Sequence, residues 1–215
     1  MKQITIEEAR SWYQDADPVH DFDHVLRVHR MAQRIGALEG ADLEILQAAA
    51  LLHDSRGSAP GGEGSPRVAH HIASAVFAGE VLTRKGWQQE KIEAVQHCIR
   101  AHRFRGEDNT PLTLEAQVLF DADKLDVLGA IGAARTIAYA ALERQPAYAE
   151  PSEHFRQSGE TLPDEPHSSY HEFLFKLCKV KDRLFTQSGQ AIAKARHNYL
   201  VNFYEQLQAE VRGER

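Results

Sequence analysis

The stretch Ala48-Ala49-Ala50-Leu51-Leu52-His53-Asp54 ends an apolar run on an imidazole and a carboxylate. The run from about residue 42 to residue 53 has the composition of a fully buried helix. Burying His53 and Asp54 without a partner would be costly, because polar groups lose their hydration there. We therefore expect both side chains to bind a ligand at the end of this helix, where Gly57 soon allows the chain to turn.

Two further polar residues interrupt apolar helical patterns elsewhere in the chain. His24 lies in a predicted helix over residues 22–38, and Asp123 lies in another over residues 114–130. Two imidazoles and two carboxylates suit a divalent Mn, Fe, Co, Ni or Zn ion better than Ca, while Mg stays an alternative. We predict that His24, His53, Asp54 and Asp123 hold one divalent transition metal ion. Such an ion lowers the pKa of a bound water and polarises a phosphoryl group.

The order His, His-Asp, Asp resembles that of the HD superfamily of metal-dependent phosphohydrolases. The AALLHD block, the pair His97 and His102, and the run DADKLDVLGAIGAAR strengthen this resemblance, which extends from about Ser11 to Arg135 and more loosely through the C-terminal helices. Together these blocks are similar to the small bacterial HD phosphohydrolases, a subgroup that includes nucleotide pyrophosphohydrolases. The resemblance implies metal-dependent hydrolysis of a phosphate ester or anhydride, with a nucleotide as the favoured substrate. A nucleoside triphosphate would give a monophosphate and pyrophosphate.

Helical spacing of apolar residues dominates the chain, and alternating strand patterns are absent from the sequence, so we predict an all-α fold. A length of 215 residues fits one HD-type domain over residues 1–215, with a core of about 11–135 and a C-terminal helical extension of about 168–212. The proline-rich stretch 145–167 is expected to be a long surface loop. A second loop, rich in glycine and proline, is expected over residues 55–66.

Composition narrows the location and the partners. Apolar stretches fall short of the roughly 18 residues of a membrane span and no signal-peptide core opens the sequence, so we expect a cytoplasmic protein that does not bind membranes. The net charge of −6, without a long basic block, argues against binding to duplex nucleic acid. The expected partner is a small phosphorylated molecule, and assembly into a homo-oligomer is left open.

An anionic substrate would need local positive charge in this acidic chain. Arg27 is expected on the same helix face as His24, and Lys124 directly follows Asp123. We predict that both contact substrate phosphates; a salt bridge of Lys124 to Asp121 or Asp126 is the alternative. Secondary candidates flank the expected site in sequence: Arg56, Arg103 and Arg105.

The roles of the remaining histidines are less determined. On one helix His97 and His102 would point about 140° apart, so both can face one ion only if the helix ends between them. In the resembled family, histidines in this region hold a second metal or contact phosphates. We predict that both bind substrate and that, with Asp54, they take part in catalysis, His97 or His102 by proton transfer. Ordinary structural histidines are the alternative, and the roles of His70 and His71 stay open.

Two other functions remain open beside the hydrolase. One is a non-hydrolytic module that senses a nucleotide; it would bind its ligand without turnover even when Mn, Co or Ni is supplied. The other is a di-iron HD oxygenase, which would need further ligands from the regions of His70, His71, His97 and His102. Metal content after anaerobic preparation separates the oxygenase from the hydrolase.

Overall fold

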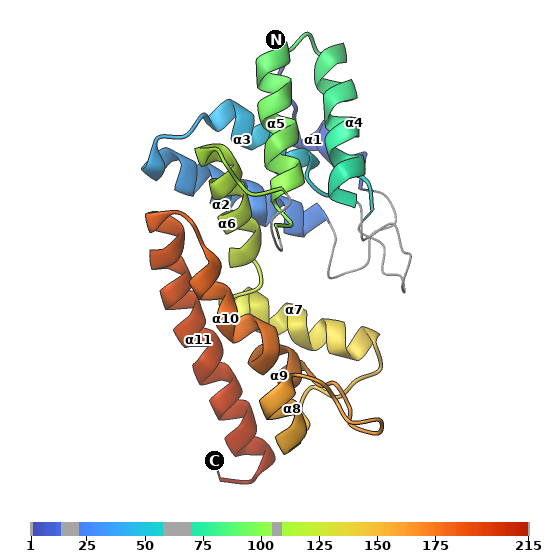
Figure 1. The fold of residues 1–215 in the computed structure, drawn as a ribbon, viewed down its shortest axis with the longest axis vertical. Helices are drawn as coiled ribbons and strands as arrows, with labels where there is room; N and C mark the ends of the chain where they lie inside the picture. The colour runs from blue at the N-terminus through green and yellow to red at the C-terminus, as the bar shows by residue number, and fades with distance from the viewer. Residues whose placement is uncertain (1, 14–21, 58–69, 105–108, 215) are drawn as a thin grey trace. The chain divides into compact units, whose positions relative to one another are not determined.

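The computed structural model describes residues 2–13, 22–57, 70–104 and 109–214. Within these ranges the secondary structure consists of helices, and the predicted all-α fold is confirmed (Figure 1). Most of the glycine- and proline-rich loop expected at 55–66 lies outside the described residues, as does Arg105. The two cysteines, Cys98 and Cys178, are both free.

Contacts between residues divide the chain into two compact units. The first comprises Met1–Asp123 and Phe185–Gly189, and the second comprises Lys124–Leu184 and Gln190–Arg215. The expectation that the whole chain folds as one domain stays a prediction.

Helix α3 is the apolar centre of the first unit. It spans Leu43–Leu52, and its residues from Ala48 to Leu52 are at most 1% exposed. The Asp42 carboxylate caps its N-terminus by accepting hydrogen bonds from the N–H groups of Glu44 and Ile45. The other helices of this unit are α1 (Ile6–Arg10), α2 (Phe22–Glu39), α4 (His70–Arg84), α5 (Gln89–Ala101) and most of α6 (Leu114–Leu125). Both α2 and α5 pack on α3, and α4 packs on α5 (Figure 1).

The single helix expected over residues 114–130 is wrong. Helix α6 ends at Leu125, and α7 (Gly129–Leu142) begins with Gly129 at φ +71°, which is a left-handed conformation that favours glycine. The carbonyl of Leu125 accepts a hydrogen bond of 2.6 Å from Arg196 Nη1 and one of 3.3 Å from the N–H of Leu128, in a tight turn after the helix. The end of α6 thus has a side-chain partner that is distant in sequence, and local spacing could not reveal that contact.

The stretch 145–167 is also more ordered than a surface loop. It contains α8 (Glu153–Ser158), whose N-terminus is capped by Ser152 Oγ accepting from the N–H of Phe155 at 3.0 Å. The Glu165 carboxylate organises the rest of the segment. It accepts hydrogen bonds from the N–H groups of Ser152 and Leu162 at 2.6 and 2.9 Å, and from the Ser152 hydroxyl at 2.7 Å.

This carboxylate makes the stability of the second unit sensitive to acid. The N–H groups of Ser152 and Leu162 are the main cause that lowers the pKa of Glu165 from 4.5 to about 2. Because the folded-state pKa is depressed, the contribution of Glu165 to stability is present above pH 4.5 and is lost as the pH falls towards 2. We expect Glu165→Gln to lower the unfolding temperature at pH 6 and to narrow its gap to the parent protein at pH 3. Equal losses at both pH values, or a similar pattern in the exposed control Glu160→Gln, would contradict this role.

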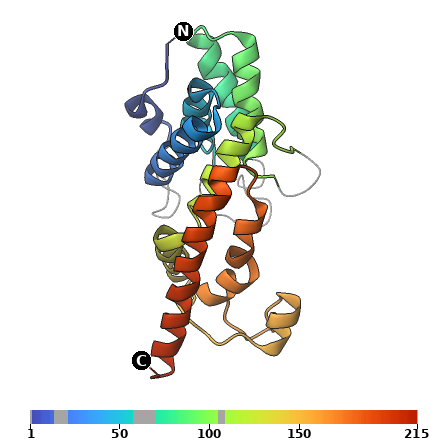
Figure 2. The same ribbon diagram turned by 90° about the vertical axis from the view of Figure 1, so that its left-hand side faces the viewer.

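The C-terminal part of the second unit is built against α11 (Gln187–Val211). The chain from residue 169 to residue 183 runs through four short helices: α9 (Ser169–Glu172), the π-helix η2 (Phe173–Leu177), α10 (Cys178–Val180) and the 3-10 helix η3 (Lys181–Arg183). Figure 2 shows α11 as a long helix alongside these elements. Its Tyr204 stacks on Phe173, with ring centroids 4.5 Å apart.

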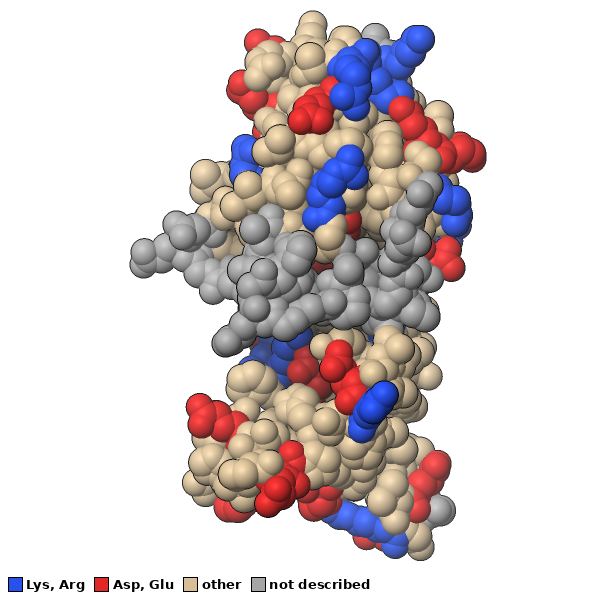
Figure 3. Space-filling view, turned by 90° about the vertical axis from the view of Figure 1, so that its right-hand side faces the viewer, with Lys and Arg blue, Asp and Glu red and all other residues tan. Residues whose placement is uncertain are grey.

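The distribution of charged side chains on the surface does not indicate a particular partner. Figure 3 shows acidic and basic side chains interspersed over the described part of the visible face. Among the described helices, none by itself has the length and apolar character needed to cross a membrane; α6 and α7 pass that test only as a bent pair.

Candidate metal centre

His53 and Asp54 follow directly after α3, where the helix ends. His53 is 0% exposed, and its Nδ1 lies 2.8 Å from the carbonyl oxygen of Ala50. This contact assigns the ring proton to Nδ1 and leaves the Nε2 lone pair facing Asp54 Oδ2 at 3.5 Å. Among the described residues, the buried His53 Nε2 has no hydrogen-bond partner. Such an atom is well suited to bind a metal ion.

Two other helices bring the remaining predicted ligands to the same place. His24 lies on the buried face of α2 and is 4% exposed. Its Nε2 lies 3.4 Å from Asp123 Oδ1 on α6 and 3.9 Å from Asp54 Oδ2. The structure thus brings together all four residues that the sequence predicts as ligands.

The opposite oxygen of Asp54 faces two further histidines. His102 directly follows the last residue of α5, and its Nδ1 lies 2.6 Å from the carbonyl oxygen of Ile99. Its Nε2 lies 3.4 Å from Asp54 Oδ1. His70, the first residue of α4, places its Nε2 3.0 Å from the same oxygen. Asp54 therefore has imidazole nitrogens on both sides.

These separations fit a divalent transition metal ion. Ligand atoms about 2.1 Å from an ion lie roughly 3 to 4 Å apart from one another. The ligand atoms of His24, His53 and Asp123 lie within 4.8 Å of one another, and the same holds for those of His53, Asp54 and His102. Both groups can close on an ion by small side-chain movements. The donor set of imidazoles and carboxylates suits a transition metal.

The protonation states also favour metal binding. Burial lowers the pKa of His53 to about 4, with His102 and His24 adding to this effect and Asp54 opposing it. Burial by itself would raise the pKa of Asp54, but the surrounding His53, His102 and His70 bring it well below its usual value. At neutral pH the centre therefore presents a neutral imidazole and a charged carboxylate, the forms that bind metal.

The structure separates His97 from this cluster. The Nε2 of His97 accepts a hydrogen bond of 3.1 Å from the N–H of Leu112. Helix α5 ends at Ala101, so His102 is released to face the centre while His97 stays on the helix. His97 thus has a structural partner, and its expected role in substrate binding or catalysis stays a prediction.

The two predicted phosphate-binding cations remain predictions. Arg27 is half-buried on α2, one turn after His24, and Lys124 is the first residue of the second unit. The carboxylates considered as partners of Lys124 have strong partners of their own. Asp121 accepts hydrogen bonds from the N–H groups of Phe185 and Thr186 at 2.9 and 2.8 Å. Asp126 pairs with Arg135 at 2.5 Å.

His70 is the member of the cluster that sequence reasoning left without a role. The only signal was its position at the start of a helix that follows a glycine-rich stretch. Its distance of 3.0 Å from Asp54 depends on the packing of α4 in the first unit. A local sequence pattern does not contain that information.

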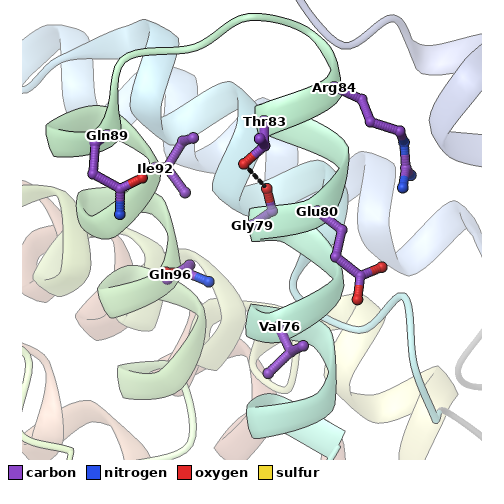
Figure 4. A pocket seen from close by; sticks show the side chains of 8 residues that line it. All are labelled: Val76, Gly79, Glu80, Thr83, Arg84, Gln89, Ile92 and Gln96. Atoms are coloured by element: carbon purple, nitrogen blue, oxygen red, sulfur yellow. Dashed lines mark hydrogen bonds between the residues drawn. The ribbon is translucent and has the colours of Figure 1, made fainter.

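A separate hollow of about 510 Å³ lies between α4 and α5 (Figure 4). Its described lining is mixed in polarity: Val76, Gly79, Glu80, Thr83, Arg84, Gln89, Ile92 and Gln96. In Figure 4 Thr83 Oγ1 donates to the carbonyl of Gly79, a bond of 2.8 Å within α4. None of the residues of the candidate metal centre belongs to this described lining, so the hollow is distinct from that centre.

An all-helical unit that gathers His24, His-Asp and Asp123 at one point has the pattern of the HD domain. Residues 21–128 match the HD domain family, and the chain belongs to that family. It is 31% identical to the uncharacterized protein YpgQ of Bacillus subtilis (strain 168), over 99% of this chain and 97% of that protein.

Solved structures agree with this assignment. The crystal structure of Bacillus subtilis YpgQ in complex with ADP is 28% identical, with a TM-score of 0.73 over 98% of this chain and 100% of that one. An HD-superfamily hydrolase from Bacillus thuringiensis is 29% identical, with a TM-score of 0.70 over 96% of this chain and 94% of that one. The protein therefore has the fold of the HD-superfamily hydrolases.

Proposed function

We propose that the protein is a metal-dependent phosphohydrolase that cleaves a phosphate ester or anhydride of a nucleotide. The observation that carries this proposal is the convergence of His24, His53, Asp54 and Asp123 in an HD fold. The relative YpgQ was crystallised with ADP, which supports a nucleotide as the ligand. Cleavage of a nucleoside triphosphate to a monophosphate and pyrophosphate is the specific reaction we favour.

The residues of the centre have distinct tasks in this reaction. A divalent ion bound by the four ligands would activate a water molecule and polarise a phosphoryl oxygen. The Ala50 carbonyl holds the His53 ring so that its Nε2 would be available to the ion, and Asp54 would supply negative charge. His102 carries its ring proton on Nδ1, against the Ile99 carbonyl, so its Nε2 is the atom that can accept a proton from the attacking water.

A substrate screen tests the proposal. Nucleoside di- and triphosphates and simple phosphomonoesters would be incubated with the protein and Mn, Co, Ni or Mg, and the products separated by ion-exchange chromatography. We expect metal-dependent turnover of a nucleotide, with pyrophosphate as a product from triphosphates. Tight binding of a nucleotide without turnover under any metal would instead identify a sensing module.

A di-iron oxygenase is a second candidate that one observation favours. Asp54 Oδ1 faces His70 and His102 while Asp54 Oδ2 faces His24 and His53, and these five side chains together would supply donors for a second iron. Protein prepared without oxygen would then contain two irons per chain and consume oxygen when a substrate is added. A single ion that supports hydrolysis excludes this candidate.

A further inference from the structure

Arg56 lies two residues after Asp54 and is held in place by its own backbone. Its N–H donates a hydrogen bond of 3.1 Å to Ser74 Oγ, and Ser74 is 0% exposed on α4. Ser74 follows His70 by four residues, so both lie on the same face of that helix. The next residue, Gly57, has φ +117°, a backbone conformation that favours glycine. The position of Arg56 is thus fixed relative to the histidine that contacts Asp54.

The side chain of Arg56 is oriented as well. Its Cζ lies 3.4 Å from the ring centroid of Phe77, which is a close cation-π contact. Phe77 is supported in turn by an edge-on contact with Trp12, at 5.4 Å between centroids. One donor, Nη1, binds the carbonyl oxygen of Ser55 at 2.9 Å. Stacking covers a face of the guanidinium and leaves its other N–H donors at the edge.

No carboxylate partner accompanies these contacts of Arg56 among the residues that the structure describes. Arg56 is exposed, and within the described part of the chain it forms no ion pair with a carboxylate. Ordering a long side chain costs conformational entropy, which an ion pair usually offsets. A planar fork of N–H donors matches two oxygens of a phosphate group.

We propose that Arg56 binds a phosphate group of the substrate beside the metal centre, an inference that rests on the proposed phosphohydrolase function. The guanidinium is held in advance on Phe77, so little further order is lost when the phosphate binds. Its positive charge offsets the repulsion between an anionic substrate and the Asp54 and Asp123 carboxylates. Arg56 thereby becomes a main phosphate contact, where sequence order alone had placed it behind Arg27 and Lys124.

Calorimetric binding of ADP and of inorganic pyrophosphate tests the proposal directly. Both probes would be titrated into the parent protein and its variants, with and without Mn²⁺. We expect Arg56→Ala to raise the Kd for pyrophosphate by about 10- to 150-fold, as for the loss of a charged hydrogen-bonding partner. Arg56→Lys should fall between parent and alanine variant, because it keeps the charge but loses the fork. The exposed Arg34→Ala on α2 is the matched control and should bind like the parent.

The stacking contact gives a second measurement. Phe77→Leu keeps an apolar residue but removes the flat surface under Arg56, so we expect a Kd several-fold above that of the parent. Because Phe77 acts through Arg56, adding Phe77→Leu to Arg56→Ala should change the Kd little further. Independent, additive effects of the two substitutions would overturn the proposed arrangement.

The outcomes separate this inference from the function on which it rests. If the parent protein hydrolyses a nucleotide while Arg56→Ala keeps the parent Kd and KM, only the Arg56 assignment is wrong. If Arg56→Ala has a lower unfolding temperature but an unchanged Kd for pyrophosphate, the Arg56 side chain has a structural role in packing the end of α3 against α4. If the parent neither binds nor cleaves any phosphate compound, the proposed function fails together with the inference.

Discussion

Asp54→Ala is expected to remove metal retention and hydrolysis together. The oxygens of Asp54 face imidazoles on both sides, at 3.0 to 3.9 Å from His24, His53, His70 and His102. Under the proposed assignment, its loss would remove a direct ligand and a negative charge that would offset the charge of the ion. Because residues outside the coordination sphere already change metal affinity by 10- to 100-fold, we expect a loss of affinity above about 100-fold.

Metal content per chain and phosphate release should be measured on the same preparations. Circular dichroism would show whether the helices persist, and Asp54→Asn provides a variant of nearly equal shape without the charge. The control is Asp164→Ala, which changes an exposed carboxylate of the second unit. Full hydrolysis with unchanged metal content in Asp54→Ala would refute the assignment of this centre.

His102→Ala is expected to lower turnover while the metal content stays at one ion per chain. His102 Nε2 lies 3.4 Å from Asp54 Oδ1; it does not belong to the group of His24, His53 and Asp123, but it forms a second possible group with His53 and Asp54, which is why the ion count is measured as well. We assign it to proton transfer, and removal of such a group typically costs 100- to 10,000-fold in rate. The measurement is kcat for the best substrate, alongside the number of ions per chain.

The number of ions decides between two readings of the same geometry. Two ions in the parent and one in His102→Ala would mean that His102 is a ligand, and would favour the di-iron alternative. His97→Ala is the companion variant. If His97 binds substrate as the sequence predicts, the KM of the His97→Ala variant rises. If His97 only accepts the hydrogen bond of the Leu112 N–H, the variant is less stable but its turnover is unchanged.

The positions of several helices could be predicted from the sequence because they depend on the local periodicity of apolar residues. Helices α2 and α3 were expected within about a residue of where they lie, since each has an apolar face or an apolar run between clear end signals. The errors occur where distant contacts set the boundary. Arg196 accompanies the end of α6 at Leu125, and Glu165 orders a segment whose prolines indicated a loop.

The sequence by itself determined that the protein is all-α and that two imidazoles and two carboxylates interrupt its apolar helices. Burying such groups is costly without a partner, so they stand out in a one-dimensional pattern. Tertiary structure alone decided which other side chains join them. Tertiary packing directs the His102 side chain towards Asp54, whereas His97 accepts a hydrogen bond from the N–H of Leu112. It also brings His70 to 3.0 Å from Asp54. The direction of a side chain depends on where its helix ends and on which helix packs beside it, and the spacing of residues in the sequence predicts neither.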